Sequence, residues 1–514
     1  MERLAEDMTE KEVNSPSFSS TPSRLLRTCW PEWLALSLYA AVVAVAIPFH
    51  EPWADEAQAW QLARNLSLPE LFKTYIRYEG SPGLWHFLLW VLNRAHFSYA
   101  GLHWVCGVIA VAAAALLIFA SPLPRALRLT LPFTYFLLFQ YAVVARSYVL
   151  APLLLFLVAW CWKKNPYLLT LLLGLLANVA IHAATISAGL AIVYGIDQFR
   201  AQFRAGNLKS NHQRRKLLAC AAILLAFYAF AIWSARPPHD IAFKTSRGPF
   251  FICVVLRLIE LSRPMGLAIP FWIVIAIWFA SRHVLIYLLP ALFCAGFCAA
   301  VYGNWWHVGL LYPTLICLLW LTWPRLTSDT SRITRLGITA TAAMFGLQIL
   351  WAGYALAFDH FHAFSPDPAA AAYLRPFVEN GDRVALTYAD AATTNAFGGT
   401  GILPYFDYNI YFNQKLPFWW WSRQDTTEEA FNQLLPSHPR IVIVEASFIG
   451  IRDRIPLTEP RYQSILQAGY NYATSFCGTM PERLAPSLTN CHVIFEFPAA
   501  TAGATTSVPP STAR

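Results

Sequence analysis

The chain has 514 residues, of which 57% are hydrophobic and only 13% are charged, and its formal net charge is +9. Soluble proteins carry about 25% charged residues, so this composition excludes an ordinary soluble domain and indicates an integral membrane protein. The basic residues lie between apolar segments, as in cytoplasmic loops, and no segment resembles a nucleic-acid-binding module. Membrane lipids are therefore expected partners, and nucleic acid is not.

The two ends of the chain differ in composition from the rest. Residues 1–28 are polar and rich in Ser, Thr and Pro, which predicts a disordered cytoplasmic tail. The first apolar segment, 33–49, follows Arg24 and Arg27 and lacks a small-residue cleavage site. We therefore expect a retained signal anchor rather than a cleaved signal peptide. Residues 499–514 predict a second disordered tail.

Residues 29–358 are expected to form a transmembrane domain of about eleven helices, although several segments are shorter than the ~20 residues that a spanning helix needs. After the first segment, the predicted spans are 100–120, 127–145, 148–162, 167–181, 183–198, 217–233, 266–280, 284–302, 308–323 and 336–358.

The loop charges predict an orientation. Threading the spans alternately places most basic loops on one side, which is the cytoplasmic side by the positive-inside rule. Residues 50–95, the turn at Arg146, the interval 234–263 and everything after residue 358 then face the opposite side. We expect a bacterial inner membrane, with the N-terminus in the cytoplasm and the C-terminal domain in the periplasm.

Two helices are predicted to lie on the outward surface, within residues 55–95. The first covers 56–78 and is interrupted by Pro69, and the second covers 83–93 and is aromatic and apolar. Both are too short or too polar to span, and amphipathic helices lying in the membrane interface fit them better.

The composition of residues 359–498 is globular and predicts an exported α/β domain. Helices are expected at 367–379 and 460–468, and strands at 383–388, 441–445, 472–476 and 492–497. Cys477 and Cys491 both lie in this domain. Outside the cytoplasm they could form one disulfide.

Asp55 and Glu56 form an acidic pair just after the first span. Carboxylates at that depth are costly unless they are solvated or paired, so they indicate a functional site, with Asp55 the first candidate. Asp55 with Gln58 three residues later also fits a helix capping box, and this alternative has about even weight. Glu79 is a further candidate, although it and Glu56 could be solvated loop acids.

Several basic residues lie in one outward interval, against the positive-inside trend. A bound phosphate would explain them, because arginine binds phosphate through paired hydrogen bonds. Pairing with lipid headgroups or with Asp240 and Glu260 is the alternative. Arg146, at another outward turn, is a further candidate. The residues of this basic interval are Arg236, Lys244, Arg247, Arg257 and Arg263.

His182 and His307 lie at the outer ends of predicted spans. They are candidates for substrate binding, although an isolated histidine there more often serves as an interfacial hydrogen-bonding residue. The sequence contains no CxxC, HxxxH or HExxH spacing. No histidine stands near the acidic pair as an evident ligand, so the metal is left unassigned.

Residues 53–60 (WADEAQAW) and 77–90 (RYEGSPGLWHFLLW) resemble the GT-C membrane glycosyltransferases. The resemblance is to the family 39-like branch of protein O-mannosyltransferases and aminoarabinose transferases. The turn Arg146-Ser147-Tyr148 also resembles this family, and the likeness covers roughly residues 30–200. The sequence departs from it at Ser81, where relatives often carry a basic residue or histidine.

The resemblance implies transfer of a sugar from a polyprenyl-phosphate-linked donor to a protein, lipid or glycan acceptor on the outer side. Asp55 would be the general base of an inverting displacement, with Glu56 beside it. Arg146 and the basic interval would receive the phosphate charge. No cofactor is certain, and a divalent metal is possible in this class. A lipid or polysaccharide transporter and a non-catalytic protein that binds lipid-linked sugar are the alternatives.

Overall fold

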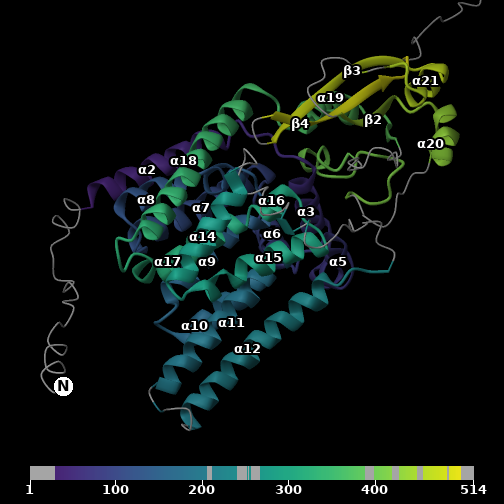
Figure 1. Cartoon of the computed structure of the whole chain (residues 1–514). Coiled ribbons are helices and arrows are strands. Elements are labelled where there is room, and N and C mark those ends of the chain that lie inside the picture. The colour runs from purple at the N-terminus through teal and green to yellow at the C-terminus, as the bar shows by residue number, and fades with distance from the viewer. Residues whose placement is uncertain are drawn as a thin grey trace, which may run out of the picture.

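The computed structural model combines a bundle of helices with a small sheet formed by the C-terminal part of the chain (Figure 1). The structure describes residues 29–204, 206, 211–239, 252, 254–255, 267–387, 399–418, 428–448, 455, 457–482 and 485–498. The protein is thus mostly helical, with several apolar helices, as the composition predicts.

Helix α2 (Trp30–Ala46) is followed by two helical segments at the positions where the sequence predicts surface helices; most residues of α3 are buried, and the outward position of both segments stays a prediction. The first is broken between α3 (Ala54–Asn65) and α4 (Leu68–Glu70), so that Pro69 lies in the first turn of α4. Proline is tolerated there because the first turn's N–H groups have no helical partner. A π-helical turn η1 (Leu71–Tyr75) and α5 (Ile76–Glu79) continue this segment, and α6 (Leu84–Arg94) forms the second segment.

The bundle is completed by helices of very different lengths, packed around a large apolar core. In chain order they are α7 (Tyr99–Ala120), α8 (Arg125–Thr130), η2 (Leu131–Phe133), η3 (Phe136–Gln140), η4 (Ser147–Val149), α9 (Leu150–Cys161), α10 (Pro166–Ala177), α11 (Ile181–Arg204), α12 (Asn211–Ala235), α14 (Ala268–Ser281), η7 (Leu285–Leu288), α15 (Leu289–Ala300), α16 (Trp305–Val308), α17 (Leu311–Leu326) and α18 (Arg332–Phe361).

The prediction of one continuous span over 127–145 is wrong. Six residues of α8 are followed by the 3-10 turn η2, the π-helical turn η3 and an irregular loop that ends at Arg146. Pro132 lies in η2 and cannot donate a backbone hydrogen bond, which interrupts a regular helix. The apolar residues from Tyr135 to Ala145 are nevertheless buried, because they belong to the apolar core of the bundle.

Within the described residues, four helices are long and apolar enough to cross a membrane. They cover Tyr99–Ala120, Asn211–Ala235, Trp305–Leu326 and Arg332–Phe361. Five shorter apolar helices accompany them, among them α2 and the helix at Ser147–Cys161. The expected total of about eleven spans remains a prediction.

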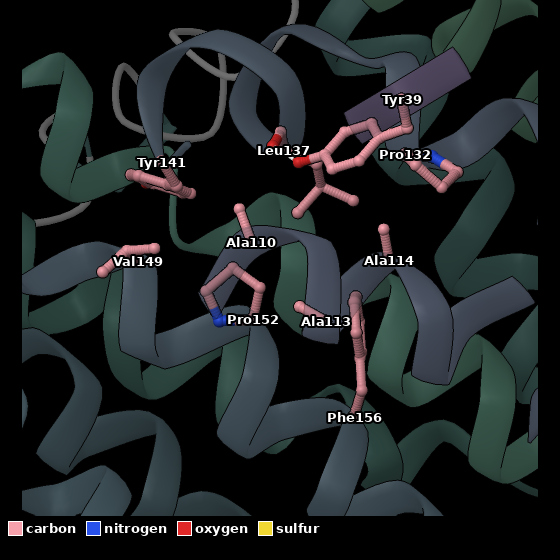
Figure 2. A pocket seen from close by; sticks show the side chains of 10 residues that line it. All are labelled: Tyr39, Ala110, Ala113, Ala114, Pro132, Leu137, Tyr141, Val149, Pro152 and Phe156. Atoms are coloured by element: carbon pink, nitrogen blue, oxygen red, sulfur yellow. Dashed lines mark hydrogen bonds between the residues drawn. The ribbon is translucent and has the colours of Figure 1, made fainter. Parts of the chain in front are cut away.

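Aromatic stacking and one long-range hydrogen bond fix the irregular segment inside the bundle. Tyr135 stacks on Trp351 of α18 with ring centroids 3.7 Å apart, and Tyr39 of α2 donates to the Leu137 carbonyl at 2.7 Å. Figure 2 shows Tyr39 and Leu137 at the edge of a mainly apolar pocket, with Phe156 of α9 on the opposite side. The loop before Arg146 is therefore held from several helices.

The C-terminal part contains a four-stranded sheet in the order β1-β2-β4-β3. Strand β1 (Val384–Leu386) pairs parallel to β2 (Ile441–Phe448), whereas β2 and β3 (Asn471–Glu482) pair antiparallel to β4 (Ala485–Glu496). The remaining elements are α19 (Asp367–Glu379), η8 (Leu403–Tyr405), α20 (Glu428–Leu434), η9 (Leu435–Ser437) and α21 (Pro460–Gln467). Helices α19 and α21 and the four strands lie at the predicted places, although β3 ends later and β4 begins earlier than predicted, and the sequence does not predict η8, α20 and η9.

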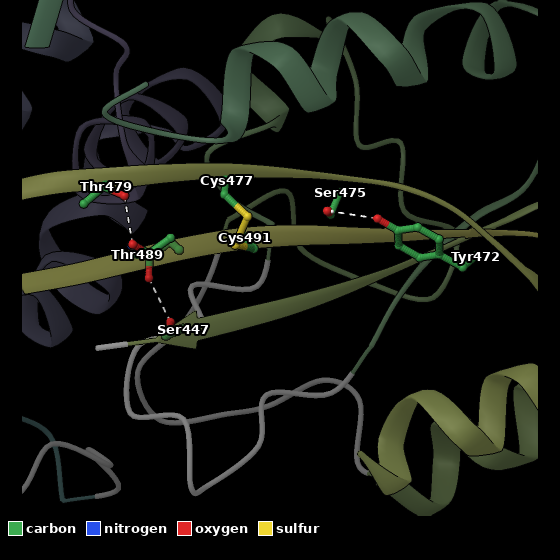
Figure 3. The surroundings of a disulfide bond; sticks show 8 residues. Ser447, Tyr472, Ser475, Cys477, Thr479, Thr489 and Cys491 are labelled. Atoms are coloured by element: carbon green, nitrogen blue, oxygen red, sulfur yellow. Dashed lines mark hydrogen bonds between the residues drawn. A yellow bond between two sulfur atoms is a disulfide. The ribbon is translucent and has the colours of Figure 1, made fainter. Parts of the chain in front are cut away.

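Cys477 and Cys491 form the disulfide that the sequence leaves open. They stand directly opposite one another on β3 and β4, with Cα atoms 4.1 Å apart (Figure 3). Thr479 and Thr489, also directly opposite, form a hydrogen bond of 2.8 Å between their hydroxyls. The covalent link therefore strengthens an existing antiparallel pair.

Candidate active site

The acidic pair begins helix α3, but the local geometry differs from the predicted capping box. Trp53, rather than Asp55, is the N-cap residue, and the Trp53 backbone N–H donates to the Glu56 carboxylate at 3.2 Å. The prediction that Asp55 caps the helix with Gln58 is therefore wrong. Because Glu56 accepts this bond, the Asp55 carboxylate is left to act outside the helix.

Asp55 forms an ion pair with Arg146. The Asp55 Oδ2 and Arg146 Nη2 atoms are 2.7 Å apart, and the two side chains are 18% and 16% exposed. The structure thus brings together the first candidate acid and a basic residue from a distant loop. Burial raises the pKa of Asp55, the Arg146 guanidinium acts in the opposite direction, and Glu56 raises it further, so the net direction is upward. A carboxylate with a raised pKa is a better proton acceptor.

Three aromatic rings enclose the Arg146 guanidinium. The Arg146 Cζ atom lies 5.5 Å from the ring centre of Trp53, 5.2 Å from that of Tyr148 and 5.1 Å from that of Trp306. Among the described residues, its buried Nη1 atom has no hydrogen-bond partner. Buried donors are normally paired, so this guanidinium donor is a candidate for pairing with an anionic group.

Glu56 is enclosed and occupies a different position from its neighbour. Its side chain is 0% exposed, and its Oε2 accepts the Ala145 N–H at 2.6 Å and lies 3.0 Å from His103 Nε2. Oε1 lies 3.4 Å from His50 Nε2. Burial acts to raise the pKa of Glu56, but hydrogen bonds from His103 and His50 outweigh it and hold the pKa well below its usual range. Glu56 is thus placed to tie α3 to the loop before Arg146.

Glu79, the third acidic candidate, is connected to α3. Gln58, one turn after Asp55, donates to the Glu79 carboxylate at 3.1 Å. Glu79 is the last residue of α5, directly before Gly80, which adopts a left-handed conformation (φ 61°). The link therefore fixes the end of α5 relative to Asp55.

His182 and His307 stack on each other, with ring centroids 4.2 Å apart. His182 Nε2 lies 2.8 Å from the Tyr302 carbonyl, and His307 Nδ1 accepts the Asn304 N–H at 2.9 Å. The His307 ring meets the edge of Tyr148 at 5.6 Å. Tyr148, one of the rings around Arg146, thus contacts His307, which in turn stacks on His182.

The basic interval is only partly described. Arg236 is exposed, and its carbonyl accepts a hydrogen bond from Arg77 Nε at 3.0 Å, which connects the end of α12 to α5. Lys244, Arg247, Arg257 and Arg263 lie outside the described residues. The predicted cluster of cations near Asp55 therefore remains a prediction.

Sequence reasoning missed the partners of Glu56. The expectation that no histidine lies near the acidic pair is wrong, since His50 and His103 both contact Glu56. His50 also contacts Asp359 near the end of α18, at 3.2 Å. His50 lies only six positions before Glu56, which was the one available signal, but His103 and Asp359 lie 47 and 309 positions from their partners.

No protein-family model and no curated protein matches this sequence. Among solved structures, the chain is similar to ArnT from Cupriavidus metallidurans, crystallised with undecaprenyl phosphate. The overlay covers 91% of this chain and 98% of that chain, with 9% sequence identity and a TM-score of 0.48. That neighbour is a GT-C glycosyltransferase, the class that the sequence resembles. A TM-score below 0.5 transfers no residue role, so the function of this chain rests on its own site.

Proposed function

We propose that the protein is an integral membrane glycosyltransferase that uses a polyprenyl-phosphate-linked sugar donor, with Asp55 as general base and Arg146 as the phosphate-binding cation. The observation that carries this proposal is the Asp55–Arg146 pair, in which one guanidinium nitrogen has no partner among the described residues. A proton acceptor and an anion acceptor are the two groups that such a displacement requires.

In this mechanism the acceptor hydroxyl donates a hydrogen bond to the Asp55 carboxylate. Its oxygen attacks the anomeric carbon, the bond from that carbon to the phosphate oxygen breaks, and the proton passes to Asp55. Asp55 then becomes neutral and no longer neutralises Arg146, so the guanidinium charge becomes available to the departing lipid phosphate. The ion pair thereby couples proton transfer to stabilisation of the leaving group.

The aromatic residues around this pair suit a sugar substrate. Trp53 and Trp306 flank Arg146, with ring centroids 5.8 Å apart, and His307 lies next to Trp306 at 5.6 Å. Aromatic rings offer flat apolar faces and exclude water, which strengthens the charge interactions between them. We assign Trp53, Trp306 and His307 to substrate positioning, together with Tyr148.

The disulfide supports the proposed orientation. Disulfides persist in oxidising compartments and are rare in the cytoplasm, so the Cys477–Cys491 bond supports placing the C-terminal domain on the outer side. Alkylation of intact and of permeabilised cells with a membrane-impermeant thiol reagent, after mild reduction, tests this. We expect labelling of both cysteines in intact cells, and labelling only after permeabilisation would reverse the orientation.

Turnover by purified protein tests the function. The wild type in lipid nanodiscs, supplied with synthetic polyprenyl-phosphate sugars and an extract of candidate acceptors, is expected to release polyprenyl phosphate. Asp55→Asn should reduce the rate by about 10²–10⁴-fold, the usual contribution of a general base. Asp407→Asn, at an exposed aspartate of the C-terminal part, is the matched control and should keep full activity. Donor binding without turnover by the wild type would instead indicate a non-catalytic binding protein.

A further inference from the structure

Three side chains from separate parts of the chain converge beside the candidate active site. His50 follows α2, Glu56 belongs to the first turn of α3, and His103 belongs to α7. One ligand atom from each, a ring nitrogen of either histidine and a carboxylate oxygen of Glu56, can be chosen so that all lie within 4.8 Å of one another. All three residues are buried. The two imidazole rings thus face one enclosed carboxylate.

The spacing of these atoms fits a coordination shell. The Nε2 atom of His103 lies 3.0 Å from one oxygen of Glu56, and that of His50 lies 3.4 Å from the other. Ligand atoms bound tetrahedrally at about 2.0–2.1 Å stand roughly 3.3 Å apart. Two imidazoles and one carboxylate also form a common ligand set for zinc.

Asp359 supplies the second layer of such a site. Both of its oxygens lie 3.2 Å from His50 Nδ1, so this nitrogen carries the proton that is donated to Asp359. A carboxylate behind a histidine fixes the ring and its tautomer in many metal sites. The opposite nitrogen, Nε2, then faces the Glu56 carboxylate, and the two lone pairs repel unless a proton or a cation lies between them.

The local charge also favours a divalent cation. Glu56 and Asp359 contribute two negative charges in a buried place, with side chains 0% and 3% exposed. A divalent ion held by His50, Glu56 and His103 would place positive charge beside both carboxylates.

We propose that His50, Glu56 and His103 bind one divalent cation of the zinc class, with Asp359 supporting His50 from behind. The ion would join the end of α2, the start of α3 and α7, and, through Asp359, the end of α18. Because Glu56 also holds the Ala145 N–H, this metal centre fixes the loop that presents Arg146. Its role is structural, and Asp55 is not one of its ligands.

Metal content tests the proposal without any turnover assay. The full chain, purified through an affinity tag that contains no histidine and without chelator, is analysed by inductively coupled plasma mass spectrometry. The expected result is about one zinc-class ion per chain, with loss of most of it in Glu56→Gln and in His103→Asn. His360→Asn, at an exposed histidine next to Asp359, is the matched control and should retain the ion.

X-ray absorption on the wild type covers the case in which the variants fail to fold. Coordination by two imidazoles and one carboxylate at about 2.0–2.1 Å supports the site, and removal of the ion by chelator should lower the unfolding temperature until zinc is restored. A metal-free wild type, or an ion bound through sulfur or by the control histidine, would overturn the proposal. Either result leaves the proposed sugar transfer standing, because that rests on Asp55 and Arg146.

Discussion

The Asp55–Arg146 pair can be tested by a double-mutant cycle on stability. Arg146→Met removes the charge but keeps an apolar side chain within contact of Trp53, Tyr148 and Trp306. Breaking a buried ion pair by removing one partner costs about 3–5 kcal/mol, because the other charge is left uncompensated. Since the two side chains are still 16% and 18% exposed, we expect the lower end of that range, about 3 kcal/mol.

Asp55→Asn should cost less, because Arg146 keeps its aromatic contacts at 5.1–5.5 Å and each contributes about 0.5–2 kcal/mol. The double variant Asp55→Asn/Arg146→Met leaves no unpaired charge. Its loss of unfolding free energy should therefore be smaller than the sum of the two single losses, by about 0.5–3 kcal/mol.

Thermal or denaturant unfolding in a defined detergent measures all four proteins. Arg146→Lys is the matched control for charge: it should keep part of the stability but lose the planar fork that contacts Asp55 and the rings. Single effects that add within about 0.3–0.5 kcal/mol would show that the two residues act independently, which would refute the paired arrangement.

Two further predictions concern the rest of the fold, and both are measured by thermal unfolding. A Cβ at Gly189 would lie 2.5 Å from Pro290 Cα and 2.7 Å from the Pro290 nitrogen. Gly189→Ala should therefore force α11 and α15 apart and lower the free energy of unfolding by about 1–3 kcal/mol. An unchanged stability would contradict this close packing. Burial acts to lower the pKa of His492, but the hydrogen bond with Asp367 and the charges of Asp367 and Glu445 raise it overall. The stabilising contribution of His492 should therefore be present in full below about pH 6.5, the pKa of the unfolded chain, and be lost as pH rises through the pKa of the folded protein. An identical pH dependence of stability in His492→Gln would contradict this role of His492.

Much of the fold follows from local sequence patterns. Helix α19 begins and ends at the predicted residues, since Pro368 in its first turn and Gly381 just after its end mark the boundaries. The break at Pro69 follows from the same reasoning. The sequence predicts one continuous span over 127–145 because the segment is apolar throughout. In the structure, Pro132 and tertiary packing divide it into short turns.

Some residues of the candidate site could also be predicted from the sequence, and others could not. Asp55 could be selected because a carboxylate next to a span is costly, and Arg146 because it lies at a predicted outward turn, where basic residues are uncommon; the structure pairs them. The sequence leaves Glu56 open as a solvated loop acid, whereas the structure places it inside the protein, one position further along the helix than Asp55. Its partners His103 and Ala145 lie 47 and 89 residues away, so no spacing motif could reveal them.

The stereochemistry of transfer tests the central claim most directly. Asp55 faces Arg146, whereas Glu56 is enclosed with 0% of its side chain exposed. Among the described residues, Asp55 is thus the one carboxylate paired with this cation, and we expect no second carboxylate to form a covalent sugar intermediate. Nuclear magnetic resonance of the glycosylated product, made by the wild type from a donor of defined configuration, should show inversion at the anomeric carbon. Retention of configuration, or the absence of any transfer from polyprenyl-phosphate sugars, would contradict a displacement driven by Asp55 and Arg146.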